Sequence, residues 1–514
     1  MRKDIETEVA IIGAGIIGAS VARELSKYKI DVVVIEKEAD FCWSATKANG
    51  GLTRECFDPS FLFYGMMETF SSRNSDNVRL KNEVFAESLS ITPYLFEELD
   101  VPLVTVGCLV IARNDRDLKV LESIQKNAED AGIKANRMID EKTAREMEPN
   151  LNKNLNILGV LESTEWSFCN SWRLCIALVE NARENGVRIF LENEVLAIER
   201  ENDTFLITTS KEKIRSRFIV NASGVNAGKI AAMVGANDFK IFPVRAQLCI
   251  LDKAARGLVN HIIMAPGKLI DSNSIIPFIS PTIEGNLELG FSCTQTNDAS
   301  DISTTDEFNK IIFSLVKELI PLISEKDLIR SFSGIMAFEN DQGFTEIIVR
   351  NSRYVPRFIN IVVPFPGISL SPSVAKKSVE ILAEQGLQLI ENYSFNGRNK
   401  SIADFSNTIS DEERDTMIVK NPSYSHVVCR CETVPEGEII EAIIKGASTV
   451  DGVKFRVGAG MGRCQGSFCG PRILKILSRE LNKPIEEITL KGEGSRILHY
   501  KKEEFLQKRY KNSC

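Results

Sequence analysis

A glycine-rich turn between an apolar strand and a helix constrains the fold of this chain more than any other feature. The run from Val9 to Ile12 is typical of a parallel strand that is buried on both faces. It is followed by Gly13, Gly15 and Gly18 in the spacing G-x-G-x-x-G. In such a unit the glycines permit a tight turn, a close approach to a pyrophosphate and close helix–strand packing, respectively. The segment therefore predicts a dinucleotide site at the start of a helix.

A second apolar run completes this unit. Residues 32–35 lead into Glu36, 23 positions after Gly13, where an acidic side chain can bind a ribose hydroxyl. A tight turn without a ligand would also use glycines, but strand, glycines, helix, strand and acid together favour the ligand. The glycine motif does not distinguish FAD from NAD.

Length, charge and hydropathy limit the class of protein. A chain of 514 residues is too long for one core and predicts two or three domains. The net charge of −7, from 63 basic and 70 acidic residues, argues against nucleic acid as a partner. We find no secretory segment and no apolar run of the ~18–20 residues that span a bilayer. We expect a cytoplasmic protein without a transmembrane segment.

Four of the 12 cysteines cluster near the C-terminus, as Cys429-x-Cys431 and Cys464-x4-Cys469. Four thiolates can hold either zinc or a two-iron cluster. Zinc sites usually show C-x2-C pairs, and this spacing differs from them. The other cysteines are most simply free thiols, and Cys56 is most simply a packed small side chain rather than a flavin attachment point.

Several segments resemble the glycerol-3-phosphate dehydrogenase and 2-hydroxyglutarate oxidase group of flavoproteins, within the D-amino-acid oxidase (DAO) superfamily. They are "SATKANGG" at 44–51, 217–235, "ISPTIEGNLELG" at 279–290, and 358–382. The resemblance covers most of residues 5–390 and implies FAD as the cofactor. It also implies that the helix beginning near 367 directs its N-terminus at the flavin, where it would stabilise negative charge.

Together the motif and the resemblance predict the cofactor-binding residues. They are Gly13, Gly15, Ile16, Ile17, Gly18, Glu36, Lys37, Ser44, Thr46, Asn49, Gly50, Gly51, Val195, Ala222, Gly224, Gly367, Ile368 and Ser369.

The C-terminal cysteines lie in segments that resemble the bacterioferritin-associated ferredoxin-like (BFD-like) [2Fe-2S] module. These segments are 429–443, 451–477 and 491–498. The resemblance implies that Cys429, Cys431, Cys464 and Cys469 bind a [2Fe-2S] cluster rather than zinc. The neighbouring glycines would let backbone amides approach the sulfurs. A two-electron flavin with a one-electron cluster suggests that electrons leave singly to another protein.

The expected fold class is α/β, with a Rossmann-like FAD-binding domain, an inserted α+β substrate domain and a small helical BFD-like domain. The FAD-dependent oxidoreductase domain is expected at 1–394, with its substrate subdomain at roughly 80–150 and 236–340. A polar linker is expected at 395–425, the BFD-like domain at 426–480 and an extension at 481–514.

Two positions depart from the group's pattern. Where the group usually has a His after the glycines, a candidate base for an alcohol, this chain has Arg54. Where the group usually has an Arg that grips an anionic substrate, this chain has Met336. "GGLTRECF" also resembles the amine and amino-acid oxidase branch, in which an Arg can hold a carboxylate with two hydrogen bonds.

The candidate catalytic residues are Arg54 and His261. The alternatives are structural: an ion pair from Arg54 to an acid such as Asp58, and a satisfied structural role for His261.

The main hypothesis is a glycerol-3-phosphate dehydrogenase-like enzyme that oxidises a small polar substrate with FAD and exports electrons through the cluster. The alternatives are an amino-acid or amine dehydrogenase, a non-catalytic iron–sulfur flavoprotein and an electron-transfer subunit. We expect a small-molecule substrate (a hydroxy or amino acid, or glycerol 3-phosphate), a protein electron acceptor or partner subunit, and an oligomer as one possibility. The sequence does not choose among the substrates.

Overall fold

The computed structural model describes residues 4–57, 75–270, 273–339, 347–402, 405 and 409–498. The chain folds into two compact units. Unit 1 comprises the chain up to residue 35 together with 42–190 and 194–399. Unit 2 combines the short segments 36–41 and 191–193 with the chain from residue 400 onward.

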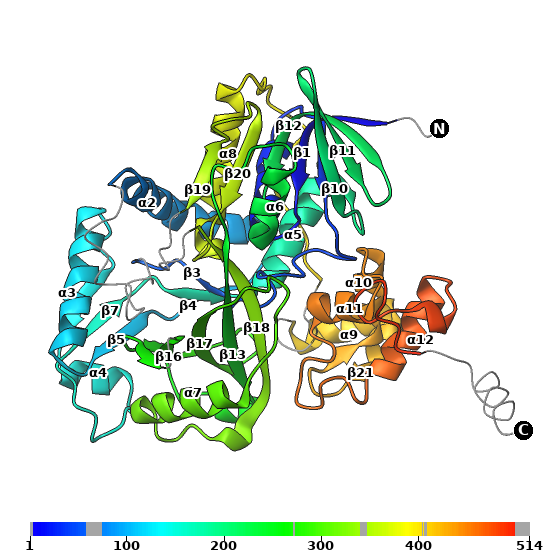
Figure 1. The fold of residues 1–514 in the computed structure, drawn as a ribbon. Helices are drawn as coiled ribbons and strands as arrows, with labels where there is room; N and C mark the ends of the chain where they lie inside the picture. The colour runs from blue at the N-terminus through cyan, green and yellow to red at the C-terminus, as the bar shows by residue number, and fades with distance from the viewer. Residues whose placement is uncertain are drawn as a thin grey trace, which may run out of the picture. The chain divides into compact units, whose positions relative to one another are not determined.

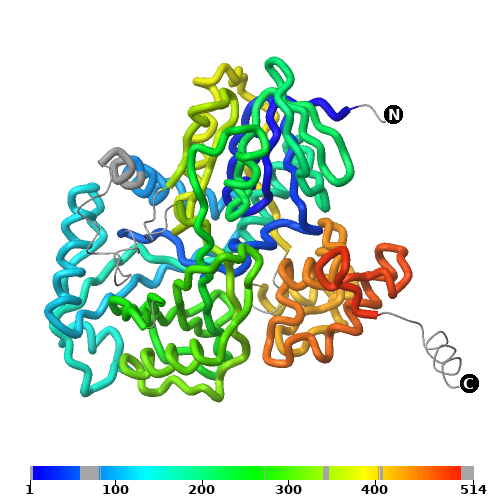
Figure 2. The backbone as a smooth tube through the Cα atoms, viewed as in Figure 1, coloured from blue at the N-terminus to red at the C-terminus, as the bar shows by residue number. Residues whose placement is uncertain are grey.

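The first sheet of unit 1 is built around the strands that the apolar runs predict. β1 (Ile5–Ile12) pairs in parallel with β2 (Val32–Ile35) on one side and β12 (Lys213–Asn221) on the other. β12 in turn pairs in parallel with β20 (Phe358–Val362). Segments more than 100 residues apart in sequence thus lie side by side in one sheet (Figures 1 and 2).

The helices of this half pack around α1 (Ile16–Ser26), which contacts both α5 (Ser171–Glu184) and α8 (Gly367–Glu384). α2 (Ser75–Glu98) lies along α8. The remaining elements of this half are β9 (Arg188–Phe190), β10 (Val195–Glu201), β11 (Thr204–Thr209), β19 (Ile348–Asn351) and α6 (Ala227–Ala232).

The second sheet of unit 1 has nine strands in the order β18-β13-β17-β16-β14-β5-β7-β6, with β15 paired to β16. Because side chains alternate along a strand, this sheet has two distinct faces. α7 (Asp306–Leu319) covers one face, with Leu287 and Leu289 in the core beneath it. The opposite face carries Leu248, Phe278 and Met336 in a second apolar cluster.

The strands of this sheet come from two stretches of the chain. They are β5 (Cys108–Ala112), β6 (Asn136–Ile139) and β7 (Gly159–Ser163), then β13 (Phe242–Leu251), β14 (Ile262–Met264), β15 (Lys268–Ile270), β16 (Asn273–Pro281), β17 (Leu287–Gln295) and β18 (Leu328–Phe338). α3 (Asp115–Asp130) and α4 (Glu141–Met147) flank β7. A small sheet of β3 (Leu52–Thr53), β8 (Ser167–Cys169) and β4 (Leu103–Thr105) completes unit 1.

Unit 2 is mainly helical, with a short hairpin of β21 (Val427–Cys429) and β22 (Val434–Pro435). Its core lies between α10 (Glu436–Ile444), α11 (Val450–Val457) and α12 (Gly470–Glu480). The segment expected as a linker contains a helix, α9 (Asp411–Lys420). Ser410 and Glu413 form a capping box at its N-terminus, which explains how a polar sequence starts a helix there.

A buried ion pair ties residues 36–41 into unit 2. The guanidinium of Arg456 on α11 donates to Asp40 Oδ2 at 2.5 Å and to Oδ1 at 2.9 Å. The two side chains are 2% and 5% exposed. Such a pair adds little over an apolar substitute, but removing one partner leaves a buried charge uncompensated.

We therefore expect Arg456→Met to lower the free energy of unfolding of unit 2 by about 3–5 kcal/mol. Hydrogen exchange of the α11 amides in the full chain would measure the loss. The control is Arg479→Met, which removes half-exposed ion pairs to Glu436 and Glu480 and should cost less than about 1 kcal/mol. The double variant Asp40→Leu/Arg456→Met should recover most of the loss; equal loss in the double variant would contradict the account.

Candidate functional site

The turn at the start of α1 requires glycine at two positions. Gly13 has φ of +105°, and a Cβ there would lie 2.6 Å from the carbonyl oxygen of Ala222. A Cβ on Gly18 would lie 2.0 Å from the carbonyl oxygen of Gly13. These contacts fix the close approach of strand, turn and helix that the motif predicts.

Gly15 differs from Gly13 and Gly18, because the space that a side chain would take at this position is empty. It is the N-cap of α1 and has no side-chain cap. The nearest atom to a Cβ at this position would be the Thr46 hydroxyl at 3.4 Å, and this hydroxyl accepts a hydrogen bond from the Ile16 amide at 3.1 Å. A helix N-terminus open in this way suits the phosphates of a dinucleotide.

A single segment connects the N-terminus of α1 with that of α8. It runs from Thr46, whose carbonyl accepts the Ser171 hydroxyl, to Glu55, whose carboxylate accepts the Ser369 hydroxyl on α8. Midway, the Asn49 side chain accepts the Gly51 amide at 2.7 Å. α8, like α1, begins without a side-chain cap. Two helix N-termini that lack a cap from their own N-cap residue, joined by this segment, fit the phosphate and flavin ends of FAD.

The other predicted cofactor residues lie as follows. Ala222 and Gly224 follow β12, and Val195 begins β10. Ile17 is in the first turn of α1, and Gly367 and Ile368 begin α8. Ser44 is exposed in the turn before Thr46, and Glu36 and Lys37 follow β2 within unit 2. The Glu36 carboxylate accepts the amide of Glu38 at 3.0 Å. These assignments remain predictions.

Arg54 lies in the strand connection that follows β3 and has a positive φ of 57°. Its guanidinium forms an ion pair with Glu165 and reaches Thr105 Oγ1 at 3.4 Å. Asp58, the partner considered from the sequence, lies outside the described residues. Cys56 nearby is buried, and burial raises the pKa of its thiol to about 11, which suits a packed, unreactive side chain.

His261 lies just before β14 and is held by Glu148. One carboxylate oxygen of Glu148 contacts the ring Nδ1 at 2.8 Å and accepts the backbone amides of Asn260 and His261. Glu148 is 1% exposed. This arrangement fixes the ring and the turn before the strand; a catalytic role for His261 stays a prediction.

The structure also places a residue that sequence reasoning missed. Glu288 on β17 is 2% exposed, and a Cβ on Gly50 would lie 3.0 Å from its Oε2. Burial raises the pKa of this carboxyl to about 8. The signal in the sequence was a single acid between Leu287 and Leu289, which alternation places on the face opposite those leucines.

The four C-terminal cysteines lie together in two pairs. The Cys469 thiol donates to Cys429, which lowers the pKa of Cys429 to about 6, and Cys431 lies within hydrogen-bond reach of Cys464. Within the described ranges, no group of three or more His, Cys, Asp or Glu side chains is arranged around one metal ion. Two thiol pairs fit a cluster of two irons, each with two cysteines, better than one tetrahedral ion.

Backbone amides also point at these sulfurs, as the glycine-rich sequence predicts. Cys429 accepts from the amides of Gly460 and Glu432, and Cys464 accepts from those of Phe468 and Gly466. The Phe468 amide is the largest cause that lowers the pKa of Cys464. Such donors stabilise thiolates and tune an attached cluster.

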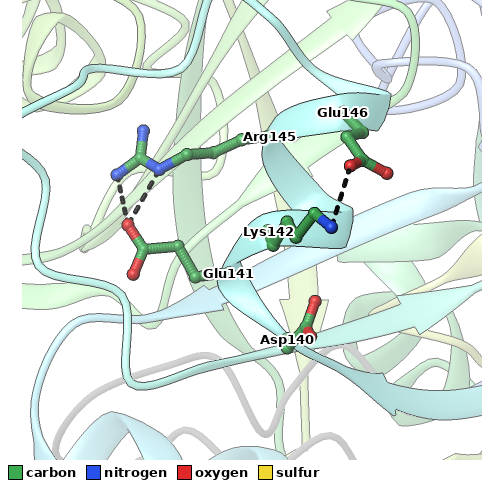
Figure 3. Close-up of a pocket in the computed structure, with 5 residues that line it drawn as sticks. All are labelled: Asp140, Glu141, Lys142, Arg145 and Glu146. Carbon is green, nitrogen blue, oxygen red and sulfur yellow. Dashed lines mark hydrogen bonds and ion pairs between the residues drawn. The ribbon is translucent and has the colours of Figure 1, made fainter.

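A surface hollow of about 630 Å³ lies beside α4 (Figure 3). It is lined by Asp140, Glu141, Lys142, Arg145 and Glu146. Glu141 pairs with Arg145 and Lys142 with Glu146, four residues apart on one helix. Because these exposed charges satisfy one another, the hollow is not a candidate for catalysis.

No described helix combines the length and the apolar composition that crossing a bilayer requires.

Comparison with known proteins agrees with both predicted cofactor sites, the FAD site and the iron–sulfur site. Residues 8–381 match the model of the family "FAD dependent oxidoreductase", and residues 427–479 match "BFD-like [2Fe-2S] binding domain". A glycerol 3-phosphate dehydrogenase of Caloramator mitchellensis is 35% identical over 96% of this chain and 98% of its own length. One subunit of the anaerobic glycerol-3-phosphate dehydrogenase of Escherichia coli K12 is 24% identical over 93% of this chain and 89% of its own length.

Among solved structures, the reduced, FAD-bound L-alpha-glycerophosphate oxidase of Mycoplasma pneumoniae superposes with a TM-score of 0.66. It is 21% identical, and the match covers 77% of this chain and 98% of that one. The predicted fold class and both predicted cofactors are confirmed, and the alternative of a non-catalytic protein loses its support. The chain belongs to the FAD dependent oxidoreductase family and carries a C-terminal BFD-like [2Fe-2S] binding domain.

Proposed function

We propose that this enzyme oxidises the secondary hydroxyl of glycerol 3-phosphate or of a closely related small polar alcohol. The observation that carries the proposal is the 35% identity to a glycerol 3-phosphate dehydrogenase over nearly the full length of both chains, iron–sulfur domain included. FAD supplies the two-electron acceptor when bound. The protein's part is to hold the cofactor between the N-termini of α1 and α8 and to place the substrate against it.

We further propose that a separate protein takes the electrons from the [2Fe-2S] domain. The Escherichia coli relative, which matches this chain over both domains, is named as one subunit of an anaerobic dehydrogenase, and this supports an acceptor that is a partner subunit. Cys431 is exposed and Cys464 partly exposed, so this side of the cluster site is accessible within unit 2. One-electron transfer through an exposed edge needs no covalent contact with the acceptor.

A second candidate substrate is an amine or amino acid. The observation that favours it is the face of the second sheet opposite α7, where Met336, Phe332 and Leu248 lie in an apolar cluster. Met336 stands where the glycerol-3-phosphate group usually has an Arg, and a methionine side chain cannot pair with a phosphate. An amino acid whose carboxylate is held by Arg54 would suit this apolar face better than a phosphate-bearing substrate would.

An anaerobic screen read by bleaching of the flavin absorbance distinguishes the two. Glycerol 3-phosphate, glycerol, 2-hydroxy acids and amino acids would each be mixed with the holoenzyme. Rapid bleaching by glycerol 3-phosphate supports the first proposal, and bleaching by amino acids alone supports the second. If none of these compounds bleaches the flavin, both substrate proposals fail.

Arg54 provides a sharper test of substrate binding. If its guanidinium holds an anionic group of the substrate, Arg54→Lys should lower kcat/KM by roughly 30-fold to several thousand-fold, because lysine cannot form the two-pronged contact. FAD content should not change. The matched variant Glu165→Gln removes only the ion-pair partner and should have a much smaller effect. Unaltered kinetics in Arg54→Lys would assign Arg54 to the ion pair alone.

A further inference from the structure

Glu288 is an unusual carboxyl for a protein interior. Its side chain is 2% exposed, and its Oε1 atom has no hydrogen-bond partner among the described residues. Leaving a buried polar atom unpaired costs free energy, so such an atom in a folded protein calls for an explanation. A carboxyl that meets a ligand only during function would account for it.

The location of Glu288 on the second sheet supports this explanation. Leu287 and Leu289 point into the core under α7, so Glu288 points to the opposite face. Its direct cross-strand neighbours on that face are Ser280 on β16 and Ile250 on β13, and Phe278 and Leu248, two residues further along these strands, belong to an apolar cluster. Glu288 is therefore a buried proton-binding group beside a serine and several apolar side chains.

The segment that faces Glu288 is the one that joins the two helix N-termini. Gly50 lies against both carboxyl oxygens, and a Cβ there would approach them to 3.0 and 3.2 Å. Four residues earlier Thr46 binds the first amide of α1, and five residues later Glu55 binds Ser369 on α8. A dinucleotide whose phosphates lie at α1 and whose flavin lies at α8 follows the same path. Glu288 thus lies beside the flavin half of the cofactor path.

We propose that Glu288 is the general base of the oxidation, a role that rests on the proposed function. Its carboxylate accepts the proton of the substrate hydroxyl, so the substrate O–H bond breaks and an O–H bond forms on Glu288. The carbon-bound hydrogen leaves with its electron pair as a hydride to the flavin, and the carbon–oxygen double bond forms. The proton on Glu288 passes to solvent after the product departs. For an amine substrate the same carboxylate takes the N–H proton.

The electrostatic surroundings suit this role. The pKa of about 8 comes from burial alone, and a base is most effective when its pKa lies near the working pH. Charged groups on neighbouring elements include Arg245 on β13, Arg330 on β18, Glu284 in the turn before β17, and Lys47, Arg54 and Glu55 in the facing segment. Glu284 pairs with Asn170, and Lys47 stacks on the ring of Trp43 at 4.3 Å. None of these charged groups is among the causes that shift the pKa of Glu288.

The test compares Glu288→Gln with the wild-type holoenzyme, using the compound that bleaches the wild-type flavin. In the wild type, anaerobic flavin reduction should accelerate about tenfold per pH unit up to about pH 8 and then level off. In Glu288→Gln the rate at pH 9 should fall about 10²–10⁴-fold and lose this pH dependence, with FAD content unchanged. Glu284→Gln, from the adjacent turn, should behave as wild type. A Glu288→Gln enzyme with the wild-type rate and pH profile overturns the proposal.

Two further measurements separate this inference from the proposed function. A protonated carboxyl should be visible in infrared difference spectra of the wild-type holoenzyme until about pH 8 and absent in Glu288→Gln. Because the folded-state pKa is raised, wild-type stability is lost as pH rises from about 4.5 to 8, so Glu288→Gln should gain in relative Tm over that range. If no compound bleaches the flavin, the proposed function fails. The infrared titration then tests Glu288 without a substrate. A carboxyl that loses its proton below pH 6 overturns the assignment of Glu288 as the general base.

Discussion

Gly15→Val yields a folded protein that contains no FAD. The backbone at Gly15, with φ of −76° and ψ of 179°, is open to any residue, and among the described residues a Cβ there would meet only the Thr46 hydroxyl within 4 Å. The valine side chain therefore occupies space that the protein leaves empty and the pyrophosphate needs. We expect complete loss of the flavin absorbance and of all substrate oxidation.

The purified variant would be assayed for FAD released on denaturation and for secondary structure by circular dichroism. Gly228→Ala in α6 is the control, because a Cβ there makes only ordinary contacts of 3.6 Å with Ile241. It should retain FAD. Gly13→Val is a different experiment, since positive φ and a 2.6 Å contact would disturb the fold itself. Stoichiometric FAD in Gly15→Val would show that the phosphates do not lie at α1.

Cys464→Ser removes the iron–sulfur cluster and leaves the flavin in place. The wild type, prepared anaerobically, should contain about two irons and two acid-labile sulfides per chain. Losing one of four thiolate ligands should abolish assembly of the cluster. Because Cys464 is only partly buried, the serine hydroxyl is tolerated in the fold. The substrate should still bleach the flavin, but electron delivery to a one-electron acceptor should fall to the background rate.

The control for this experiment is Ser467→Ala in the same loop, which removes only a hydroxyl that donates to the Cys464 carbonyl. Iron, sulfide and FAD would be determined for both variants alongside acceptor reduction. A wild-type protein with one zinc per chain and no sulfide would contradict the cluster. A Cys464→Ser protein that reduces the acceptor at the normal rate would show that electrons leave by another route.

Much of the architecture follows from local sequence. The apolar runs at 9–12 and 32–35 become β1 and β2, because a parallel strand buried on both faces needs an uninterrupted apolar run. α5 and β9 likewise lie in one continuous stretch, 171–190, in which a helix leads directly into a strand. The expected linker contains α9, because its capping box is a local signal that the polar composition obscured.

The hydrogen-bond and ion-pair partners of the candidate site residues could not be predicted from local sequence. Arg54 meets Glu165, 111 residues away, and His261 meets Glu148, 113 residues away. Asp40 and Arg456 are separated by 416 residues. Such pairs depend on which strands and helices the fold brings together, and one sequence records no such proximity.

The sequence by itself predicted a dinucleotide site and a four-thiolate site, because the spaced glycines and the two short cysteine segments are local motifs, and the resemblance to known families then implied FAD and [2Fe-2S]. It determined the fold class for the same reason, since strand and helix periodicity are set by near neighbours. Only the tertiary structure decided which side chains face the reaction. Glu288 stands out because the second sheet turns it toward Gly50 and away from water, and it is this burial that raises its pKa. Desolvation is a property of the whole packed interior, so no stretch of sequence contains it.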